Sequence, residues 1–314
     1  MKLVRVRERD LPAQGESPSR YGLLEDDDRL RLLPADHTFT DALAAIGDDG
    51  TGTAELETSD PAAWELLAPV PAPASVRDCV GFLQHIRNTR RSRGDVAPLP
   101  PVWSERPGFY FANPHSLRSA TAAIPIPTGC EAFDFELEVA VVLAAGGRDL
   151  TAAEAKEAIA GYVLLCDWSA RDIQAVERGM QVGLGKAKDA AMSLGPWVLS
   201  AGEAAPFVRH DGLDIPVGAY VNGERVTAPE TRYTGMDWTF EEIVAFASVG
   251  VDLVPGEVIA AGTVPTGCLL EHSAGDGFRG WLKEGDVVRL DAGPLGEIVS
   301  PIAASTPQAQ WRSA

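Results

Sequence analysis

The chain has 314 residues, enough for one large domain or for a large domain with a smaller partner. Its 27 Lys and Arg residues against 45 Asp and Glu residues give a formal net charge of −18, which argues against nucleic acid or an anionic membrane as a partner. Hydrophobic residues make up 45% and charged residues 23% of the sequence, as in an ordinary globular protein.

The four cysteines, Cys79, Cys130, Cys166 and Cys268, are scattered along the chain and form no Cys-x-x-Cys pair. This pattern indicates neither a zinc cluster nor a disulfide framework, and it is typical of a reducing cytoplasm. The N-terminal run is too charged for a signal peptide, and no apolar run of the sequence approaches membrane-spanning length. We therefore expect a cytoplasmic protein.

The N-terminal part is predicted to be small and largely β. Short strands are expected at Leu3–Val6, Tyr21–Leu24 and Arg29–Leu33, followed by a short helix at Thr40–Ile46. The alternating prolines that follow this part form a stiff, extended connector at Pro69, Pro71 and Pro73. We therefore predict a small β-rich N-terminal domain at 1–70 and a larger domain at 71–314.

Asp78 and His85 come just after the connector, about two helical turns apart. If the segment from Ser75 to His85 is helical throughout, the two side chains share one face. Taken alone, an Asp and a His on a polar helix face are more often solvated than functional. Their position between the connector and the acidic motif below favours a functional role.

A basic segment follows His85 in this otherwise acidic chain. Its arginines are Arg87, Arg90, Arg91, Arg93 and Arg106. The segment also contains Gly and several Pro residues, which is typical of a mobile lid that closes over an anionic substrate. A disordered charged loop without function is the alternative interpretation.

The stretch Phe133–Asp172 carries the most informative pattern. Glu136 and Glu138 alternate with apolar residues, so on a strand both carboxylates project from one face. Val139–Leu143 continue as an unbroken apolar run, which indicates a strand covered on both faces. Two buried anions on one face must share a proton or a cation, and neutralising either one should relieve their repulsion. A solvated strand face is the alternative.

A third carboxylate follows on the next predicted strand. A capping box at Thr151 begins a short helix, Ala152–Ala160, which Gly161 ends. A second apolar strand, Tyr162–Cys166, then places Asp167 at its tip. A βαβ-like connection would bring this tip beside the first strand, and three converging carboxylates suit a hard divalent cation.

The C-terminal part is predicted to be mostly scaffold. Asn222-Gly223 indicates a β-hairpin, and a second capping box at Thr239 precedes a helix at Ile243–Ser248. A final hairpin is expected between Val287–Leu290 and Glu297–Ser300. Neither a Gly-x-Gly-x-x-Gly fingerprint nor a P-loop occurs in the sequence.

Several motifs together resemble the fumarylacetoacetate hydrolase family. They are Glu136-Leu-Glu138, Asp167-Trp-Ser-Ala-Arg171-Asp-Ile-Gln174, Gly-Pro-Trp at 195–197 and Gly262-Thr263, in the family's order and at compatible distances. The resemblance, to the bacterial branch of the family, runs from about Val76 to the C-terminus. It implies an α+β fold that is mainly β, with a roll-like, mixed β-sandwich catalytic domain, usually in a homodimer. Relatives often carry a small domain where the β-rich N-terminal domain is predicted here.

The resemblance also implies roles for individual residues. The metal ligands would be Asp78, Glu136, Glu138 and Asp167, holding Mg²⁺, with Ca²⁺ or Mn²⁺ as alternatives. His85 would be the general base, and the substrate's carboxylate and oxo groups would contact Arg171, Gln174 and Thr263. Lys188 matches the family's active-site lysine. Because Ala187 and Ala190 replace the family's usual Gly and Phe, Lys186 remains a competitor for that role.

Other details of the predicted site stay open. In relatives a glutamate assists the histidine, but neither the lid nor the Thr263 turn presents one at a matching position, and Glu105 is a weak candidate. Arg171 could instead pair with Asp172 or Glu177. The aromatic strand Phe109–Phe111 is expected to belong to the core rather than to the substrate wall.

These residues would support a reaction through an enolate. Four carboxylates on an octahedral Mg²⁺ would leave two positions for a 1,3-dicarbonyl or a 2-oxo acid. The metal would stabilise the enolate formed when a carbon–carbon bond breaks, and His85 would take a proton from the attacking water. We therefore expect a Mg²⁺-dependent hydrolase of a β-diketone or 2,4-dioxo acid, of the fumarylacetoacetate or acylpyruvate type, in the catabolism of aromatic compounds. Its expected partner is a small anionic oxo acid.

Two other functions remain open. One is an isomerase, decarboxylase or hydratase of oxo-dienoates, of the 2-hydroxyhepta-2,4-diene-1,7-dioate type, which needs only the metal and enolate stabilisation. The other is a ligand-binding protein without catalytic activity. Incorporation of solvent oxygen into the product separates hydrolysis from the isomerase or decarboxylase reaction.

Overall fold

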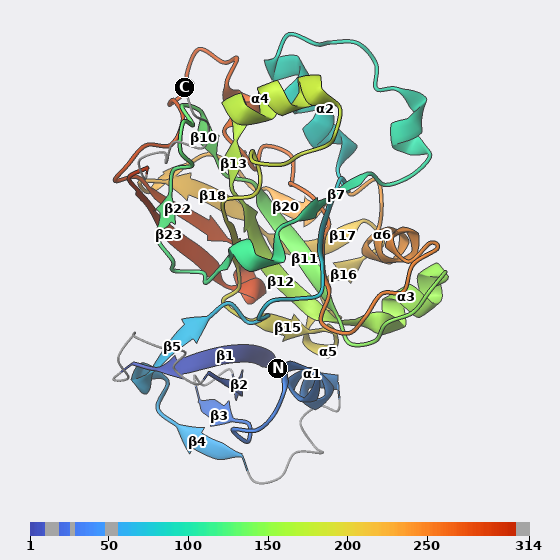
Figure 1. Cartoon of the computed structure of the whole chain (residues 1–314), viewed down its shortest axis with the longest axis vertical. Coiled ribbons are helices and arrows are strands. Elements are labelled where there is room, and N and C mark those ends of the chain that lie inside the picture. Colours follow the sequence, from blue (N-terminus) through green and yellow to red (C-terminus); the bar gives the residue numbers. More distant parts are fainter. Residues whose placement is uncertain (10–18, 26–28, 48–55, 306–314) are drawn as a thin grey trace, which may run out of the picture.

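The computed structural model describes residues 1–9, 19–25, 29–47 and 56–305. The protein is rich in sheet, with the N-terminal strands at one end of the molecule and helices α2 and α4 at the other (Figure 1). The α-helices of these residues are α1 (Phe39–Gly47), α2 (Leu83–Ser92), α3 (Ala152–Ala158), α4 (Arg171–Met180), α5 (Ala201–Ala204) and α6 (Phe240–Ala247). None of these helices is long and apolar enough to cross a lipid bilayer. The predicted α+β class, mainly β, is confirmed.

One large sheet runs through the molecule and, within the described residues, has thirteen strands. Its main path, in order of pairing, is β4 (Glu57–Ser59), β3 (Leu30–Leu32), β2 (Arg20–Leu24), β1 (Lys2–Glu8), β15 (Val198–Ser200), β12 (Ile159–Asp167), β11 (Leu137–Leu143), β21 (Val258–Ala260), β6 (Val76–Cys79) and β7 (Phe109–Ala112). Off this path lie β14 (Met192–Leu194), which pairs with β12 and β8 (Leu117–Arg118), and β5 (Trp64–Leu67), which pairs with β1. The predicted N-terminal strands and helix are confirmed. Because β1 pairs with both β2 and β15, these strands extend the large sheet, and the boundary after residue 70 stays a prediction.

Smaller sheets cover one side of the large one. They consist of β10 (Phe133–Asp134) with β13 (Ser169–Ala170), of β16 (Val208–Arg209), β17 (Gly212–Pro216) and β20 (Arg232–Thr234), and of β19 (Glu224–Arg225), β18 (Gly218–Val221), β22 (Val287–Asp291), β23 (Glu297–Ala303) and β9 (Ile124–Pro125). Both predicted hairpins are present. Between β18 and β19, Asn222 and Gly223 adopt left-handed φ values of 53° and 82°, as a tight hairpin turn requires.

Strand β11 is buried along its whole length and contributes side chains to two cores. Val139 and Val141 pack with α6 and the sheet of β22 and β23, whereas Ala140 and Val142 pack on the opposite face with α1 and the N-terminal strands. Glu138 lies in register with Ala140 and Val142. The predicted strand, covered on both faces, is therefore confirmed, with Glu138 on the face of Ala140 and Val142. Glu136 lies just before the strand, in an isolated bridge to Cys268.

The segment Ser75–His85 is not helical throughout, so the condition under which Asp78 and His85 would share a helix face is not met. Val76–Cys79 form strand β6, which pairs with β21 and β7 and is buried on both faces. The chain turns at Gly81, where a Cβ atom would overlap the carbonyl oxygen of Ala261, and α2 begins only at Leu83. Asp78 and His85 therefore share no helix face, and the turn at Gly81 is what brings both toward the same pocket.

The helix predicted to end at Gly161 ends earlier, at Ala158, and β12 follows directly. Both predicted capping boxes, at Thr151 and Thr239, are present. The expected βαβ arrangement is wrong, because β11 and β12 pair antiparallel. The antiparallel pair still places the end of β12 beside the start of β11, since the Asp167 amide donates to the Glu136 carbonyl at 3.2 Å.

Gly161 is required for sheet packing rather than for a helix end. A Cβ atom there would overlap the carbonyl oxygen of Leu199 on β15, so we expect Gly161→Ala to lower the free energy of unfolding by about 1–3 kcal/mol. Urea unfolding measures the change. Gly47→Ala is the matched control, because its Cβ would meet no atom within 4 Å. Equal stability of the two variants would contradict the close approach of β12 and β15.

Candidate active site

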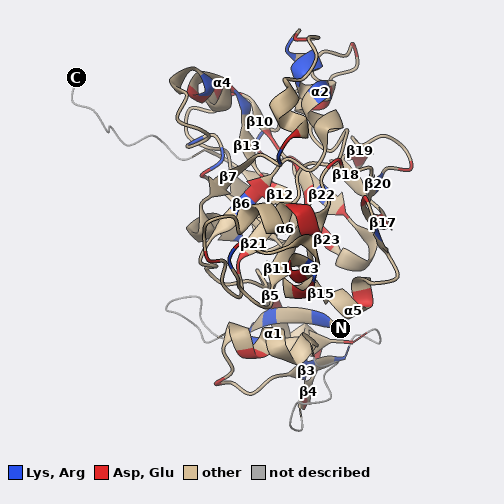
Figure 2. Ribbon diagram, turned by 90° about the vertical axis from the view of Figure 1, so that its right-hand side faces the viewer, with Lys and Arg blue, Asp and Glu red and all other residues tan. Residues whose placement is uncertain are grey.

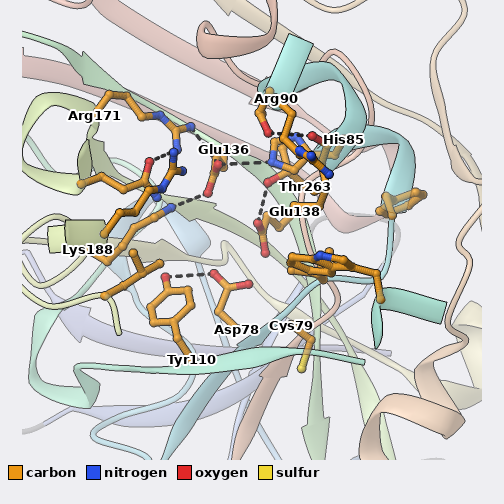
Figure 3. Close-up of a pocket in the computed structure, with 18 of the residues that line it drawn as sticks. Asp78, Cys79, His85, Arg90, Tyr110, Glu136, Glu138, Arg171, Lys188 and Thr263 are labelled. Carbon is orange, nitrogen blue, oxygen red and sulfur yellow. Dashed lines mark hydrogen bonds and ion pairs between the residues drawn. The ribbon is translucent and has the colours of Figure 1, made fainter. Parts of the chain in front are cut away.

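Side-chain alternation on β12, on its neighbour β11 and on β6, one strand further along, places acidic residues on one face of the large sheet. Asp78 on β6, Glu138 on β11 and Asp167 on β12 share the face of Val76, Ala140 and Leu165, which belong to one core. They lie where the strands approach α2 and α4, and Asp78 and Glu138 line a cavity of about 370 Å³ (Figure 3).

These three carboxylates form the acidic cluster. One oxygen atom from each lies within 4.8 Å of the others, and all three side chains are buried. Glu138 Oε1 accepts a hydrogen bond from Thr263 Oγ1 at 2.9 Å, and Asp167 Oδ2 accepts one from the Tyr110 hydroxyl at 2.7 Å. In the described part of the chain, the other oxygens, Glu138 Oε2 and Asp167 Oδ1, are buried without a hydrogen-bond donor.

The electrostatics of the acidic cluster favour a bound cation. Burial raises the pKa values of Asp78, Glu138 and Asp167, and repulsion from neighbouring carboxylates adds to the shift, although the charge of Lys188 acts against it. An ion with a preference for carboxylate oxygens would satisfy the two unpaired oxygen atoms and offset the repulsion. The donor set is made of oxygen atoms alone, so the residues fit a hard divalent cation.

Glu136 lies beside the acidic cluster, but its oxygens are engaged by cations. Arg171 Nη2 donates to Glu136 Oε1 at 2.8 Å, and the Lys188 ammonium contacts Oε2. Although burial acts in the opposite direction, the charges of Arg171 and Lys188 hold the pKa of Glu136 well below its usual value. Neutralising Glu136 would relieve its repulsion with the acidic cluster, as expected, but it would also remove the counter-charge of Arg171 and Lys188. Its role as a metal ligand stays a prediction.

The structure distinguishes the two competing lysines. Lys188 is buried and contacts Glu136, Asp167 and the Ser169 hydroxyl, the last at 2.6 Å. Although burial disfavours the ammonium, the carboxylates of Asp167 and Glu136 raise the pKa of Lys188. The side chain of Lys186 is 76% exposed and pairs with Asp189 outside the pocket. Of the two, Lys188 is the pocket residue.

Arg171 and Gln174 lie on the first turn of α4, and both are buried in the pocket wall. Arg171 Nε donates to Asp134 Oδ2 at 2.8 Å, and Nη1 donates to Gln174 Oε1 at 3.3 Å. The alternative pairing with Asp172 or Glu177 does not occur. With the bond to Glu136, these contacts leave two of the five guanidinium N–H groups of Arg171 available to a ligand.

His85 has an acidic partner that sequence reasoning missed. His85 Nδ1 lies 2.8 Å from Oε1 of Glu271, on the short 3₁₀ helix η4 (Leu270–His272). Asn88 Nδ2 and the Thr266 amide donate to the other oxygen of Glu271, at 2.6 and 2.9 Å. Glu105 lines a different cavity, so that candidate is wrong. Between Thr263 and Glu271 the chain turns at Thr266, which has a left-handed φ of 70°. The number of residues between them therefore could not indicate that Glu271 lies beside His85.

Tyr110 is a second residue that sequence reasoning placed wrongly. Its hydroxyl lies 2.7 Å from Asp167 Oδ2 and 3.1 Å from Asp78 Oδ2. Because the hydroxyl has one proton, it donates a hydrogen bond to only one of these oxygens at a time. Its neighbours Phe109 and Phe111 are 37% and 64% exposed, so the expected core packing of these aromatics is wrong. Side-chain alternation along β7 could have indicated this position, because Tyr110 is the register partner of Asp78 and its side chain lies on the same face of the sheet.

The basic segment after His85 is partly helical. Arg87, Arg90 and Arg91 belong to α2, and Arg90 pairs with Asp95 at 2.7 Å in the loop that follows. The disordered-loop alternative is wrong for this helical part. Closure of the segment over a substrate stays a prediction.

Neutralising the two strand glutamates should have opposite effects on the metal-free protein. We expect Glu138→Gln to raise the free energy of unfolding, because it removes a buried anion that forms no ion pair within the described residues. Glu136→Gln should lower it by about 3–5 kcal/mol, because Arg171 and Lys188 lose a buried counter-charge. Urea unfolding in the presence of a chelator measures both changes.

The gain in the free energy of unfolding that we expect from Glu138→Gln should depend on pH. Because burial and the neighbouring Asp78 raise the pKa of Glu138, the folded wild-type protein loses stability as the pH rises from the unfolded value of about 4.3 through the raised value. The difference between variant and wild type should therefore grow over that range. Glu224→Gln, on an exposed strand, is the control. A pH-independent difference, or destabilisation by Glu138→Gln, would contradict the charge distribution described above.

Comparisons with known proteins agree with this geometry. Residues 75–303 match the family model described as fumarylacetoacetate (FAA) hydrolase C-terminal. A protein of Burkholderia lata, whose name assigns it only provisionally to the hydrolases, is 31% identical over 306 residues, which cover 95% of this chain and 97% of that protein.

Solved structures share the fold over almost the whole chain. A Mycobacterium abscessus protein, named provisionally as a 2-hydroxyhepta-2,4-diene-1,7-dioate isomerase, is 25% identical, with a TM-score of 0.70, and the match covers 98% of this chain and 100% of that one. A fumarylacetoacetate hydrolase from Exiguobacterium antarcticum is 24% identical, with a TM-score of 0.70, and the match covers 97% and 99% of the two chains. With its strand-borne carboxylates, its histidine–glutamate pair and these similarities, the chain belongs to the fumarylacetoacetate hydrolase family.

Proposed function

We propose that the protein is a Mg²⁺-dependent hydrolase that cleaves a carbon–carbon bond in a β-diketone or 2,4-dioxo acid, of the fumarylacetoacetate or acylpyruvate type. The observation that carries the proposal is the His85–Glu271 pair, which shares one pocket with the acidic cluster. A divalent cation held by Asp78, Glu138 and Asp167, with Glu136 as a further candidate ligand, would supply positive charge against the negative charge that develops on the substrate's oxygens. Mg²⁺ is the ion proposed, with Ca²⁺ or Mn²⁺ as alternatives.

Glu271 orients His85 for proton transfer. As the acceptor at Nδ1, its carboxylate favours the tautomer that carries the proton there, so Nε2 has a free lone pair. Nε2 lies 3.6 Å from Glu136 Oε1, beyond a hydrogen bond, which leaves it available to a water molecule. Because Glu271 is itself held by Asn88 and Thr266, the imidazole is fixed in orientation before a substrate binds.

For a 2,4-dioxo acid such as an acylpyruvate, the proposed reaction balances with one water molecule. His85 Nε2 takes a proton from water, and the water oxygen bonds to the carbonyl carbon at position 4 of the dioxo acid. The bond between carbons 3 and 4 then breaks, and its electron pair passes to the 2-oxo acid fragment as an enolate. The imidazolium returns its proton to carbon 3. The products are one carboxylic acid and one 2-oxo acid.

Several polar groups around the pocket would position the substrate. Gln174 and the two remaining N–H groups of Arg171 suit the carboxylate beside the oxo group. Lys188 already has three acceptors, so it would act through its positive charge and by holding Glu136 and Asp167. Thr263 holds Glu138 and would contact the substrate only if its hydroxyl exchanges partners.

An isomerase or decarboxylase acting on an oxo-dienoate is the second candidate. The observation that favours it is the similarity to the Mycobacterium abscessus protein described above, whose name gives an isomerase activity. In such a reaction His85 would move a proton between carbon atoms of the substrate, and no water would be consumed. The arrangement of His85 and Glu271 is compatible with either chemistry.

The cellular setting is part of the proposal. All four cysteines are free thiols, and three of them are buried, which supports a reducing compartment such as the cytoplasm. A homodimer and a role in the catabolism of aromatic compounds follow from the family resemblance.

Oxygen-18 labelling separates the two candidates. If the protein hydrolyses an acylpyruvate or fumarylacetoacetate in H₂¹⁸O, we expect one solvent oxygen atom in the newly formed carboxylate. Mass spectrometry of products from a short incubation with Mg²⁺ measures it. Turnover that leaves both product carboxylates unlabelled would exclude hydrolysis and favour the isomerase or decarboxylase.

The role of His85 can be tested with a matched histidine. General-base catalysis typically contributes about 10²–10⁴-fold, so His85→Ala should lower kcat by that factor and change the affinity for Mg²⁺ only a few-fold. Glu271→Gln should also lower kcat, because it removes the charge that orients the imidazole. The control is His210→Ala, at an exposed position. A His85→Ala enzyme that keeps more than about a tenth of its kcat would refute the assignment.

A further inference from the structure

Asp134 is a buried carboxylate to which the proposed reaction assigns no role. It ends strand β10, which pairs antiparallel with β13, and its side chain is fully buried. Both strands lie beside α4, at the end of the molecule away from the N-terminal strands, where acidic and basic positions both occur (Figure 2). Asp134 does not line the active-site cavity, so it would act on a substrate only through other residues.

The Asp134 carboxylate joins three separate segments of the chain. Oδ1 accepts hydrogen bonds from the amides of Phe135 and Leu269, both at 2.8 Å. Oδ2 accepts one from the Leu270 amide at 3.1 Å and one from Arg171 Nε at 2.8 Å. Strand β10, the start of η4 and the first turn of α4 therefore meet at one buried anion.

One of these segments carries the partner of the general base. Leu269 and Leu270 begin η4, and Glu271 follows directly. Glu271 Oε1 lies 2.8 Å from His85 Nδ1. Because the first amides of a helix have no acceptor within it, an external acceptor fixes the position of its first turn. Asp134 supplies two such acceptors, and a shift of η4 would carry Glu271 away from the imidazole.

A second segment carries the cation proposed to bind the substrate's carboxylate. The guanidinium of Arg171 is planar, so a hydrogen bond at Nε fixes the direction of all its N–H groups. Asp134 accepts that bond, while Glu136 and Gln174 accept from the two outer nitrogens. Without Asp134, Arg171 would keep one carboxylate partner instead of two, and its two free N–H groups would no longer have a fixed direction.

The bonding pattern requires a carboxylate at this position. Four donors converge on Asp134, and an ionised carboxylate offers about four lone-pair positions and no proton. An asparagine has the same size but only one oxygen, so its amide group would place N–H donors against those of Leu270 and Arg171. Two buried donors would then lack an acceptor, which favours displacement of the groups that carry them.

We propose that Asp134 is a positioning residue that holds Arg171 and η4 in one arrangement, so that a single buried charge orients both the carboxylate contact and the general base. The inference rests on the proposed function in one respect, which is that Arg171 contacts the substrate's carboxylate and His85 transfers a proton. The alternative is that Asp134 only stabilises the fold.

Nuclear magnetic resonance of the histidine rings tests the link to the general base without catalysis. In full-length, metal-free protein with ¹⁵N-labelled imidazoles, the couplings between ring protons and nitrogens report which nitrogen carries the proton. We expect the neutral His85 ring to be protonated at Nδ1 in the wild type, and His85→Ala identifies its signals. In Asp134→Asn, as in Glu271→Gln, the tautomer protonated at Nε2 should become populated.

Calorimetry tests the link to Arg171. Pyruvate, the simplest 2-oxo acid, should bind the Mg²⁺-loaded wild type, and it should bind Asp134→Asn about tenfold more weakly because the guanidinium loses its orientation. Since Asp134 acts through Arg171, adding Asp134→Asn to Arg171→Gln should weaken binding no further than about twofold. A wild type that does not bind pyruvate would overturn this part of the proposal.

Asp286→Asn is the matched control. Asp286 is also a buried carboxylate, and it accepts hydrogen bonds from the Lys283 amide and Asn222 Nδ2, but it does not line the cavity. Its substitution should leave the His85 tautomer unchanged and the pyruvate affinity within about twofold of wild type.

A variant that removes both partners covers the case in which Asp134→Asn does not fold. Asp134→Asn combined with Arg171→Gln leaves no unpaired charge at this position, and its His85 ring is compared with that of Arg171→Gln alone. We expect the tautomer protonated at Nε2 only in the combined variant. Equal His85 rings in the two proteins would overturn the proposal.

The outcomes also separate this inference from the proposed hydrolysis. If either readout keeps its wild-type value in Asp134→Asn, or if Asp286→Asn changes both equally, Asp134 only stabilises the fold, whatever reaction is found. Changes in both readouts that Asp286→Asn does not share would support the positioning role even if no solvent oxygen enters any product. In that case hydrolysis alone fails.

Discussion

Burial of excess negative charge is the constraint on which the rest of this site depends. Five carboxylates, Asp78, Asp134, Glu136, Glu138 and Asp167, are buried close to two permanent cations, Arg171 and Lys188. Removing a charge from water costs several kcal/mol unless a counter-charge or hydrogen-bond donors replace the water. Asp134 and Glu136 have such partners. The acidic cluster has two anchoring hydroxyl groups and part of the charge of Lys188, and it keeps two unpaired oxygens.

The fold makes this burial unavoidable. The strands that carry Asp78, Glu138 and Asp167 are neighbours in the large sheet or separated by one strand, and side-chain alternation directs all three to one face. Further along the same face, Ala140, Val142 and Val163 form an apolar core that holds the strands in register. The same strands therefore contribute to the apolar core and to the site. Their apolar residues lie at one end of the face and their carboxylates at the other.

The residues around the acidic cluster hold its carboxylates and His85 in place. Thr263 and Tyr110 each anchor one oxygen of a carboxylate and leave its second oxygen unpaired. Glu271, fixed by Asn88 and Thr266, orients His85 from the opposite side.

Local patterns in the sequence predicted much of this arrangement. Alternation around Glu136 and Glu138 indicated one face of a buried strand, and the capping boxes at Thr151 and Thr239 depend only on residues three apart. Contacts set by pairing between distant strands could not be predicted in this way. Tyr110 reaches the acidic cluster through the register of β7 with β6, and Glu271 reaches His85 through an irregular turn.

Errors also arose where the tertiary structure overrides a local preference. The spacing of Asp78 and His85 places them on one face only if the segment before His85 is helical. Val76–Cys79 instead extend an existing sheet, where pairing on both sides outweighs helix propensity. Gly161 was interpreted as a helix end, whereas the close approach of β15 is what requires a residue without a side chain. Neither partner strand is adjacent in sequence to the residue that it constrains.

We propose that Glu138 Oε2 and Asp167 Oδ1 bind a divalent cation. A crystal structure of the protein with Mn²⁺, with anomalous diffraction to locate the ion, tests it most directly. The account predicts one ion bonded to both of these oxygens and to Asp78, with Thr263 and Tyr110 still holding the opposite oxygens of Glu138 and Asp167. An ion bound elsewhere, or a cluster that remains empty at saturating Mn²⁺, would contradict it.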